Sequence, residues 1–348
     1  MWSVQLSSIE PFVYSIFGLQ YPLGQPTHEQ KACQAKFDDL IANHASHIDR
    51  LLQDGCAVSK QGKTFIWLGY WKTRTEYLNW WTSDVVTDFW TQLSPYAGMW
   101  REIMMPSTTR TQYGTNQPKS SGLGHLGPPT SMGKRSGYWG CYRHRMSASQ
   151  DDNFATHIEK DIVARRSPHD THDELPIRAG RLFLANLPDN ICFVVEGQDH
   201  SDVSDAENEF WFRNFDQSVE RWMKDLLSAD ESSGILDSRL CYDPESGIFR
   251  ESDLPALDYN KKVQLFYFKD LRHMETIGRR NKGHVDLRHR FMRAYGPGGE
   301  MSSGKVCLWV ETTVLKGNEI ECEYVGCLEG TGWMALAGRP VFPVEYRD

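Results

Sequence analysis

The chain has 348 residues, of which 40% are hydrophobic and 24% are charged, and its formal net charge at pH 7 is −8. This length suits one large domain or two ordinary ones. The acidic balance and the lack of a long Lys/Arg run argue against a nucleic-acid partner. No apolar stretch reaches the ~18–20 residues that cross a membrane, and the first residues lack a basic signal segment, so we expect a cytoplasmic protein.

The eight cysteines are scattered along the chain, and no Cys-x-x-Cys pair occurs. Their spacing fits neither a zinc site nor a disulfide framework, so we expect them to be reduced and mostly buried. Twelve Trp, fourteen Tyr and sixteen Phe are a heavy aromatic load. It suits either a large core or a pocket for a planar ligand, and composition does not choose between them.

Two segments predict a strand followed by a helix. In the first, residues 64–71 form a continuous apolar run typical of a buried strand, and the periodic residues 75–93 predict a helix. In the second, a strand is predicted at 191–195, followed by a helix with apolar residues every three or four positions. Those positions are Trp211, Phe215, Val219, Trp222 and Leu226.

The C-terminal part continues with strands at 263–268, 305–315 and 320–326, and with a helix at roughly 270–295. This order predicts an α+β fold of two ferredoxin-like halves in one compact unit, a pseudo-duplicated barrel. The halves would be residues 1–165 and 177–348. No sequence repeat accompanies the duplication, which is inferred from element order alone.

Three segments are predicted to be loops. Residues 106–136 are rich in Gly, Pro, Ser and Thr, which indicates a lid or a disordered excursion. Residues 166–176 hold two histidines among acidic residues. A metal site there is conceivable, but a solvated loop is favoured because no ligand geometry is defined. Residues 296–304 indicate a flexible turn.

One histidine stands out in the helix predicted near the C-terminal end. At helical spacing His284, Leu287 and Phe291 share one face, while the basic Arg288 is expected to point elsewhere. Gly283 lacks a Cβ and would let a flat group approach the helix. An imidazole on such a face is either a core histidine bonded to a carbonyl or a neutral ligand offered to a haem iron.

Four short segments read together resemble the haem-containing aldoxime dehydratases, the phenylacetaldoxime dehydratase family. Weaker similarity at 100–102 and 323–325 keeps the same order, so the resemblance spans nearly the whole chain. Each motif is weak alone, and their order and spacing make the match specific. The segments are FGLQY at 17–21, GYWGCYRHR at 137–145, DNICFVVEGQD at 189–199, and Gly283-His284 followed by LWVETTVL at 308–315.

The resemblance implies a homodimer of ferredoxin-like architecture that binds haem b, with His284 as the proximal ligand of the iron. Because Cys-x-x-Cys-His is absent, the haem would be held non-covalently. The implied reaction is a lyase reaction that removes water from an aldoxime, C=N–OH, to leave a nitrile. Phe291, Gly283 and Val310 are expected to contact the haem.

On the distal side, the resemblance places Arg145, which would organise polar groups and stabilise negative charge on oxygen. From the residue alone, pairing of Arg145 with a surface carboxylate is favoured, because most Arg side chains are exposed. The sequence departs from the family at two positions. Val310 matches the distal histidine and Glu196 matches the distal serine. A valine cannot donate a proton, and losing a positioned acid costs ~10²–10⁴-fold in rate.

Glu196 is the predicted substitute for the missing acid. Burial would raise its pKa and Arg145 would lower it. It could instead be a strand-end glutamate facing solvent. The open alternatives are dehydration of a differently shaped N–O substrate, another haem reaction (peroxidase-like, peroxygenase-like, or biosynthetic N–O or N–N chemistry), and haem binding without catalysis.

Two further histidines could bear on the predicted site. His289 lies five positions after His284, ~140° further around an ideal helix, so we expect it to face solvent or to support the site indirectly. His200 could reach the distal side, but a role in a loop is favoured.

Overall fold

A computed structural model describes residues 1–6, 10–56, 59–133, 142–158, 175–229, 231–252, 254–339 and 341–347. Its strands are β1 (Trp2–Val4), β2 (Val13–Tyr21), β3 (His47–Cys56), β4 (Ser59–Trp71), β5 (Met99–Met104), β6 (Thr111–Thr115), β7 (Pro129–Ser131), β8 (Ile177–Ala185), β9 (Ile191–Asp199), β10 (Ile235–Tyr242), β11 (Lys261–Phe268), β12 (Cys307–Leu315), β13 (Ile320–Leu328) and β14 (Glu345–Arg347). Its α-helices are α1 (His28–Ile41), α2 (Arg74–Trp81), α3 (Asp84–Thr91), α4 (Tyr142–Arg145), α5 (Asp205–Trp211), α6 (Gln217–Leu227), α7 (Leu271–Arg280) and α8 (Lys282–Tyr295).

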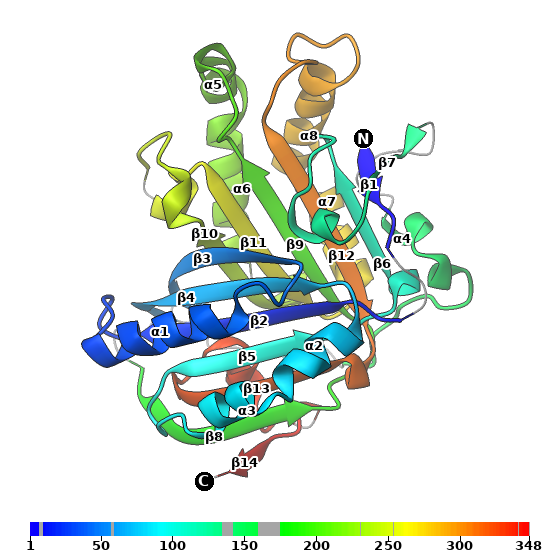
Figure 1. Cartoon of the computed structure of the whole chain (residues 1–348). Helices are drawn as coiled ribbons and strands as arrows, with labels where there is room; N and C mark the ends of the chain where they lie inside the picture. The colour runs from blue at the N-terminus through cyan, green and yellow to red at the C-terminus, as the bar shows by residue number, and fades with distance from the viewer. Residues whose placement is uncertain are drawn as a thin grey trace.

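The strands form one curled sheet of 14 strands in which the paired neighbours are antiparallel (Figure 1). The predicted α+β class is therefore confirmed. Residues 13–104, the N-terminal motif, run β-α-β-β-α-β with the strand order β5-β2-β4-β3. Residues 191–315, the C-terminal motif, repeat this order as β12-β9-β11-β10. Each motif thus has the element order of a ferredoxin-like unit.

The motifs join edge to edge through β3 and β10, at the pairs Gln53–Cys241 and Leu52–Tyr242. Within the described residues, the strand order starts at β14 and ends at β7, so no pairing closes the sheet into the predicted barrel. Edge strands also cross over between the sequence halves. β13 pairs with β5, whereas β6 pairs with β12. The division of the chain into two halves, residues 1–165 and 177–348, stays a prediction.

The segment predicted as a lid or disordered loop, residues 106–136, contributes two short strands to this sheet. β6 pairs with β12 along five residues, and β7 extends the sheet edge through β1. The Gly, Pro and Ser residues of this segment indicate a loop, whereas pairing with β12 makes residues 111–115 a strand. In contrast, residues 296–304 form turns as predicted.

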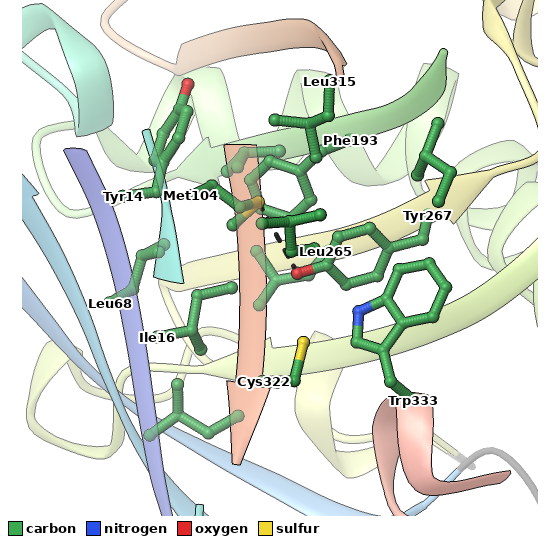
Figure 2. Close-up of a cluster of buried hydrophobic side chains, with 14 of the residues drawn as sticks. Tyr14, Ile16, Leu68, Met104, Phe193, Leu265, Tyr267, Leu315, Cys322 and Trp333 are labelled. Atoms are coloured by element: carbon green, nitrogen blue, oxygen red, sulfur yellow. Dashed lines mark hydrogen bonds between the residues drawn. The ribbon is translucent and has the colours of Figure 1, made fainter. Parts of the chain in front are cut away.

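The concave inner face of the sheet holds a core shared by both motifs. Figure 2 shows Ile16, Leu68 and Met104 of the N-terminal motif facing Leu265 and Tyr267 of the C-terminal motif. The helices cover the outer face, with α1 to α3 over one motif and α5 to α8 over the other (Figure 1). No helix in the described part of the chain has the length and apolar content that crossing a membrane requires.

Two predicted helices are each interrupted. The run 75–93 forms α2 and α3, because Ser83 takes extended backbone angles at the start of α3. The run 270–295 forms α7 and α8, because Asn281 takes extended angles and accepts a hydrogen bond on its side chain from the His284 N–H. Asn at the residue before a helix stabilises a new helix start. The second break shapes the site described below.

A buried carboxylate ties the two motifs together. Glu102 on β5 is fully buried and accepts from Arg239 Nη2 on β10 at 2.6 Å and from Tyr267 Oη on β11 at 2.9 Å. Tyr324 Oη on β13 donates to the same carboxylate at 2.7 Å. A buried ion pair of this kind is costly to break, because removing one partner leaves the other charge desolvated.

We expect Glu102→Ala to lower the free energy of unfolding by about 3–5 kcal/mol, because Arg239 would stay buried with one of its two carboxylate partners gone. Urea denaturation measures this loss. Glu321→Ala is the matched control, since its side chain is 50% exposed and its ion pair with Arg101 is worth about 1 kcal/mol or less. Equal losses in both variants would contradict the role given to Glu102.

Candidate functional site

A cavity of about 440 Å³ lies between the outer face of β9, β11 and β12 and the helices α6, α7 and α8. Small-molecule sites typically enclose ~300–1,000 Å³ and are mostly apolar. Most of this wall is apolar or aromatic, and its larger side chains include Trp222, Met223, Leu226, Phe266, Phe268 and Leu287.

In the described part of the N-terminal motif, aromatic side chains fill the layer between the helices and the sheet. Phe17 and Trp67 of the sheet pack on Phe37 of α1, with ring centroids 4.9 and 4.8 Å away. Trp80 and Trp90 complete this cluster. The layer between helices and sheet is therefore filled in the N-terminal motif and contains the cavity in the C-terminal motif.

Strand alternation decides which residues of β9 face the cavity. Phe193 and Val195 point into the shared core, whereas Val194 points outward under the helices. Continuing the outward series by twos gives Glu196 and Gln198, and both line the cavity. Glu196 therefore faces the pocket and not solvent at a strand end.

Glu196 sits between Val310 of β12 and Gln264 of β11, its direct partners across the ladder. Directly paired residues lie on the same face with Cβ atoms ~4.5–5.5 Å apart. Burial raises the pKa of Glu196 to about 7. No described residue donates a hydrogen bond that would stabilise its carboxylate. This carboxyl group can therefore hold or release a proton near neutral pH.

On the opposite wall, the imidazole of His284 lines the cavity at the start of α8. Its Nδ1 lies 2.9 Å from the carbonyl oxygen of Gly278. Gly278 lies in the last turn of α7, where carbonyls lack partners within the helix. The break at Asn281 thus supplies both the backbone start of α8 and the acceptor that orients the ring.

The tautomer of His284 follows from that contact. A carbonyl oxygen only accepts, so Nδ1 carries the hydrogen of the neutral ring and Nε2 keeps its lone pair. Burial lowers the pKa of His284 and thereby favours the neutral form, whereas the hydrogen bond to Gly278 raises that pKa. Trp222 stacks on the ring with centroids 4.3 Å apart. These contacts hold the ring in one orientation and favour the neutral form in which Nε2 keeps its lone pair.

Other residues of α8 follow helical spacing from His284. Leu287 and Phe291 line the cavity, and Phe291 is 8% exposed. Arg288 also lines it, which corrects the expectation that it points elsewhere. Positions four apart share a helix face, so the spacing from 284 to 288 was the signal. Burial lowers the pKa of Arg288 to about 10.

Gly283 does not lie at the cavity, where contact with a haem would require it. It is exposed and does not line the cavity, and a Cβ there would approach Asn281 Oδ1 at 3.2 Å. Val310 is as expected a cavity residue, 2% exposed. The glycine that lies close to the imidazole is Gly278, where an added Cβ would stand 3.6 Å from His284 Cε1.

Arg145 does not join Glu196 in the cavity. It lies at the end of α4 over β6, where its Nη1 donates to Gln112 Oε1 at 3.3 Å. β12 separates β6 from β9, so Val310 lies between the two predicted partners in the sheet. Accordingly, burial alone shifts the pKa of Glu196, and the predicted lowering by Arg145 is not found.

Neither His289 nor His200 lines the cavity. His289 is exposed, as expected. His200 is buried and stacks on Phe249 with centroids 4.5 Å apart, close to Gln198. Residues 166–174, most of the segment considered for a metal, lie outside the described residues. The described residues hold no cluster of His, Cys, Asp and Glu that could bind a metal ion.

Comparisons with known proteins agree with this architecture. The family model of the haem-containing dehydratases matches residues 15–333. The phenylacetaldoxime dehydratase of Bacillus sp. (strain OxB-1) is 22% identical over 336 residues, which cover 92% of this chain and 87% of that protein. An aldoxime dehydratase crystallised with butyraldoxime superimposes with a TM-score of 0.75 at 20% identity, covering 96% of this chain and 88% of that one. A second aldoxime dehydratase structure gives the same score and identity, covering 96% and 90%.

The break between α7 and α8 leads to a stability prediction. Asn281→Ala should lower the free energy of unfolding by about 0.5–2 kcal/mol, because the His284 N–H loses its acceptor. Asn281→Ser is the matched control, since serine keeps a capping oxygen and should stay close to the wild type. Urea midpoints of the three proteins test this. If alanine is as stable as serine, the capping role is wrong.

Proposed function

Because the chain belongs to the haem-containing dehydratase family, we propose that the cavity under α6, α7 and α8 binds haem b non-covalently. We further propose a lyase that removes water from an aldoxime, or performs a close variant on another N–O substrate. The observation that carries this proposal is the neutral imidazole of His284, held by the Gly278 carbonyl with Nε2 available at an apolar cavity.

The residues present suit a haem. His284 would ligate the iron from the helix side, while Phe291 and Leu287 supply apolar contacts. Val310, on the sheet side, leaves space where a histidine would otherwise project. When bound, the haem supplies an iron with one open position that coordinates the substrate nitrogen. The apolar lining excludes bulk water from that position.

Glu196 would move the protons of the reaction. Conversion of R–CH=N–OH to R–C≡N and water breaks the N–O bond and removes the proton on carbon. The protonated carboxyl group gives its proton to the departing hydroxyl, which leaves as water. The resulting carboxylate accepts the proton from carbon, so Glu196 ends as it began. A pKa of about 7 suits a group that must act as acid and then as base.

The relatives support the substrate class. One is named for phenylacetaldoxime and another was crystallised with butyraldoxime. A peroxidase-like pair of arginine and carboxylate is less well supported, because Arg145 lies over β6 and does not line the cavity. The homodimer and the cytoplasmic location stay predictions.

The first test concerns the axial ligand. Reconstituted with haem b, the wild-type protein should show a Soret band that shifts on reduction. His284→Ala should lose its tight haem binding, or give a band restored by added imidazole, because the Nε2 ligand is gone. His289→Ala, an exposed histidine on the same helix, should match the wild type. An unchanged spectrum in His284→Ala would contradict the assignment.

The second test concerns the proton donor. Under anaerobic reduction, nitrile formation from phenylacetaldoxime or butyraldoxime should fall ~10²–10⁴-fold in kcat in Glu196→Gln. The wild-type kcat/KM should decline as pH rises through about 7, because the acid form that protonates the hydroxyl is lost there.

Glu196→Gln should show no such decline. Glu321→Gln, at an exposed position on β13, is the control and should behave like the wild type. An unaltered rate and pH profile in Glu196→Gln would remove it from the mechanism. Haem binding without nitrile from either aldoxime in the wild type would favour a different haem reaction or a haem-binding protein without catalysis.

A further inference from the structure

A second, larger cavity borders another side of α7. Its volume is about 1110 Å³, and its walls come from α7, from residues 153–158 and from the turn at 232–233. Ile277 is its one residue shared with the haem cavity, so among the described residues the two spaces are distinct along most of the helix.

The wall of this second cavity is strongly basic in a protein of net charge −8. Arg272, Thr276 and Arg280 step by four residues and therefore share one face of α7. Arg143 of α4 and Lys269, just before α7, add two more cations. The described lining residues thus include four cations and one carboxylate, Asp270.

That carboxylate is already engaged. Asp270 accepts from the backbone N–H of His273 at 2.9 Å and lies 2.7 Å from its ring Nδ1. Arg143 donates to the carbonyl of Asn153 and pairs with Glu275 at 3.5 Å. At the far end, Asp225 accepts from Asn281. Neither Arg272 nor Arg280 has an ion-pair partner among the described residues.

We propose that this cavity binds a small anion carrying a phosphate or pyrophosphate group. The guanidinium fork matches phosphate oxygens two at a time. Here the cations come from α4, from the start of α7 and from its end. Their positive charges are therefore spread over a wider area than the two oxygens of one carboxylate would match, which favours an anion with more oxygens. The Thr276 hydroxyl, between the two arginines, adds a hydrogen-bonding group. This site is separate from the proposed haem reaction.

Calorimetric titration of the full chain with inorganic pyrophosphate tests the proposal, with and without bound haem b. We expect saturable binding in both states, and citrate should bind about tenfold or more weakly. Arg272→Ala combined with Arg280→Ala should weaken pyrophosphate binding about tenfold or more for each arginine removed. Lys282→Ala combined with Arg293→Ala removes two exposed cations of α8 that line neither cavity, and it should bind like the wild type.

Arg272→Lys with Arg280→Lys keeps the charge but not the fork, and it guards against misfolding of the alanine variant. We expect intermediate affinity. The proposal is overturned if pyrophosphate gives no saturable binding, if the arginine variants bind like the α8 control, or if citrate binds equally well. Loss of binding on loading haem would also overturn it, because the cavity would then serve the haem carboxylates.

Discussion

The hydrogen bond from His284 Nδ1 to the Gly278 carbonyl is the contact on which the site depends. It exists because α7 ends and α8 begins at Asn281, which frees a carbonyl of the last turn of α7. A continuous helix would have used that carbonyl internally and left the ring free to rotate. The break therefore sets the tautomer, and the tautomer decides which nitrogen is offered to a metal.

The curled sheet explains why there is room for a ligand in front of that nitrogen. Both motifs bury their inner faces in one shared core, so each outer face needs only a cover of helices. Aromatic rings such as Trp67 and Phe37 fill the cover of the N-terminal motif. Over β9 and β12 the sheet instead presents Glu196 and Val310, and the helices stand off from them. The hollow layer places the Glu196 carboxyl group opposite the His284 imidazole.

Local periodicity predicted a good part of this site. The face shared by His284, Leu287 and Phe291 was read correctly, and the outward position of Glu196 follows from alternation along β9. The same spacing also places Arg288 on this face, although its charge favours a position in solvent. The apolar period continues across Asn281, so it does not indicate the helix start there.

Contacts between distant segments could not be predicted in the same way. β6 becomes a strand by pairing with β12, some 200 residues away, although the Gly, Pro and Ser residues around it indicate a loop. The place of Arg145 depends on that same strand, because its guanidinium rests on Gln112. Sequence similarity put Arg145 and Glu196 on one side of a ring. In the structure Arg145 lies over β6, and β12 separates β6 from the strand that carries Glu196.

We propose that the cavity under α6, α7 and α8 binds one haem b through His284. Titrating the haem-free wild-type protein with haem b, while recording the Soret band in the ferric and then the ferrous state, tests it most directly. The account predicts a sharp end point at one haem per chain and a histidine-ligated spectrum in both states. A featureless titration without an end point would contradict it.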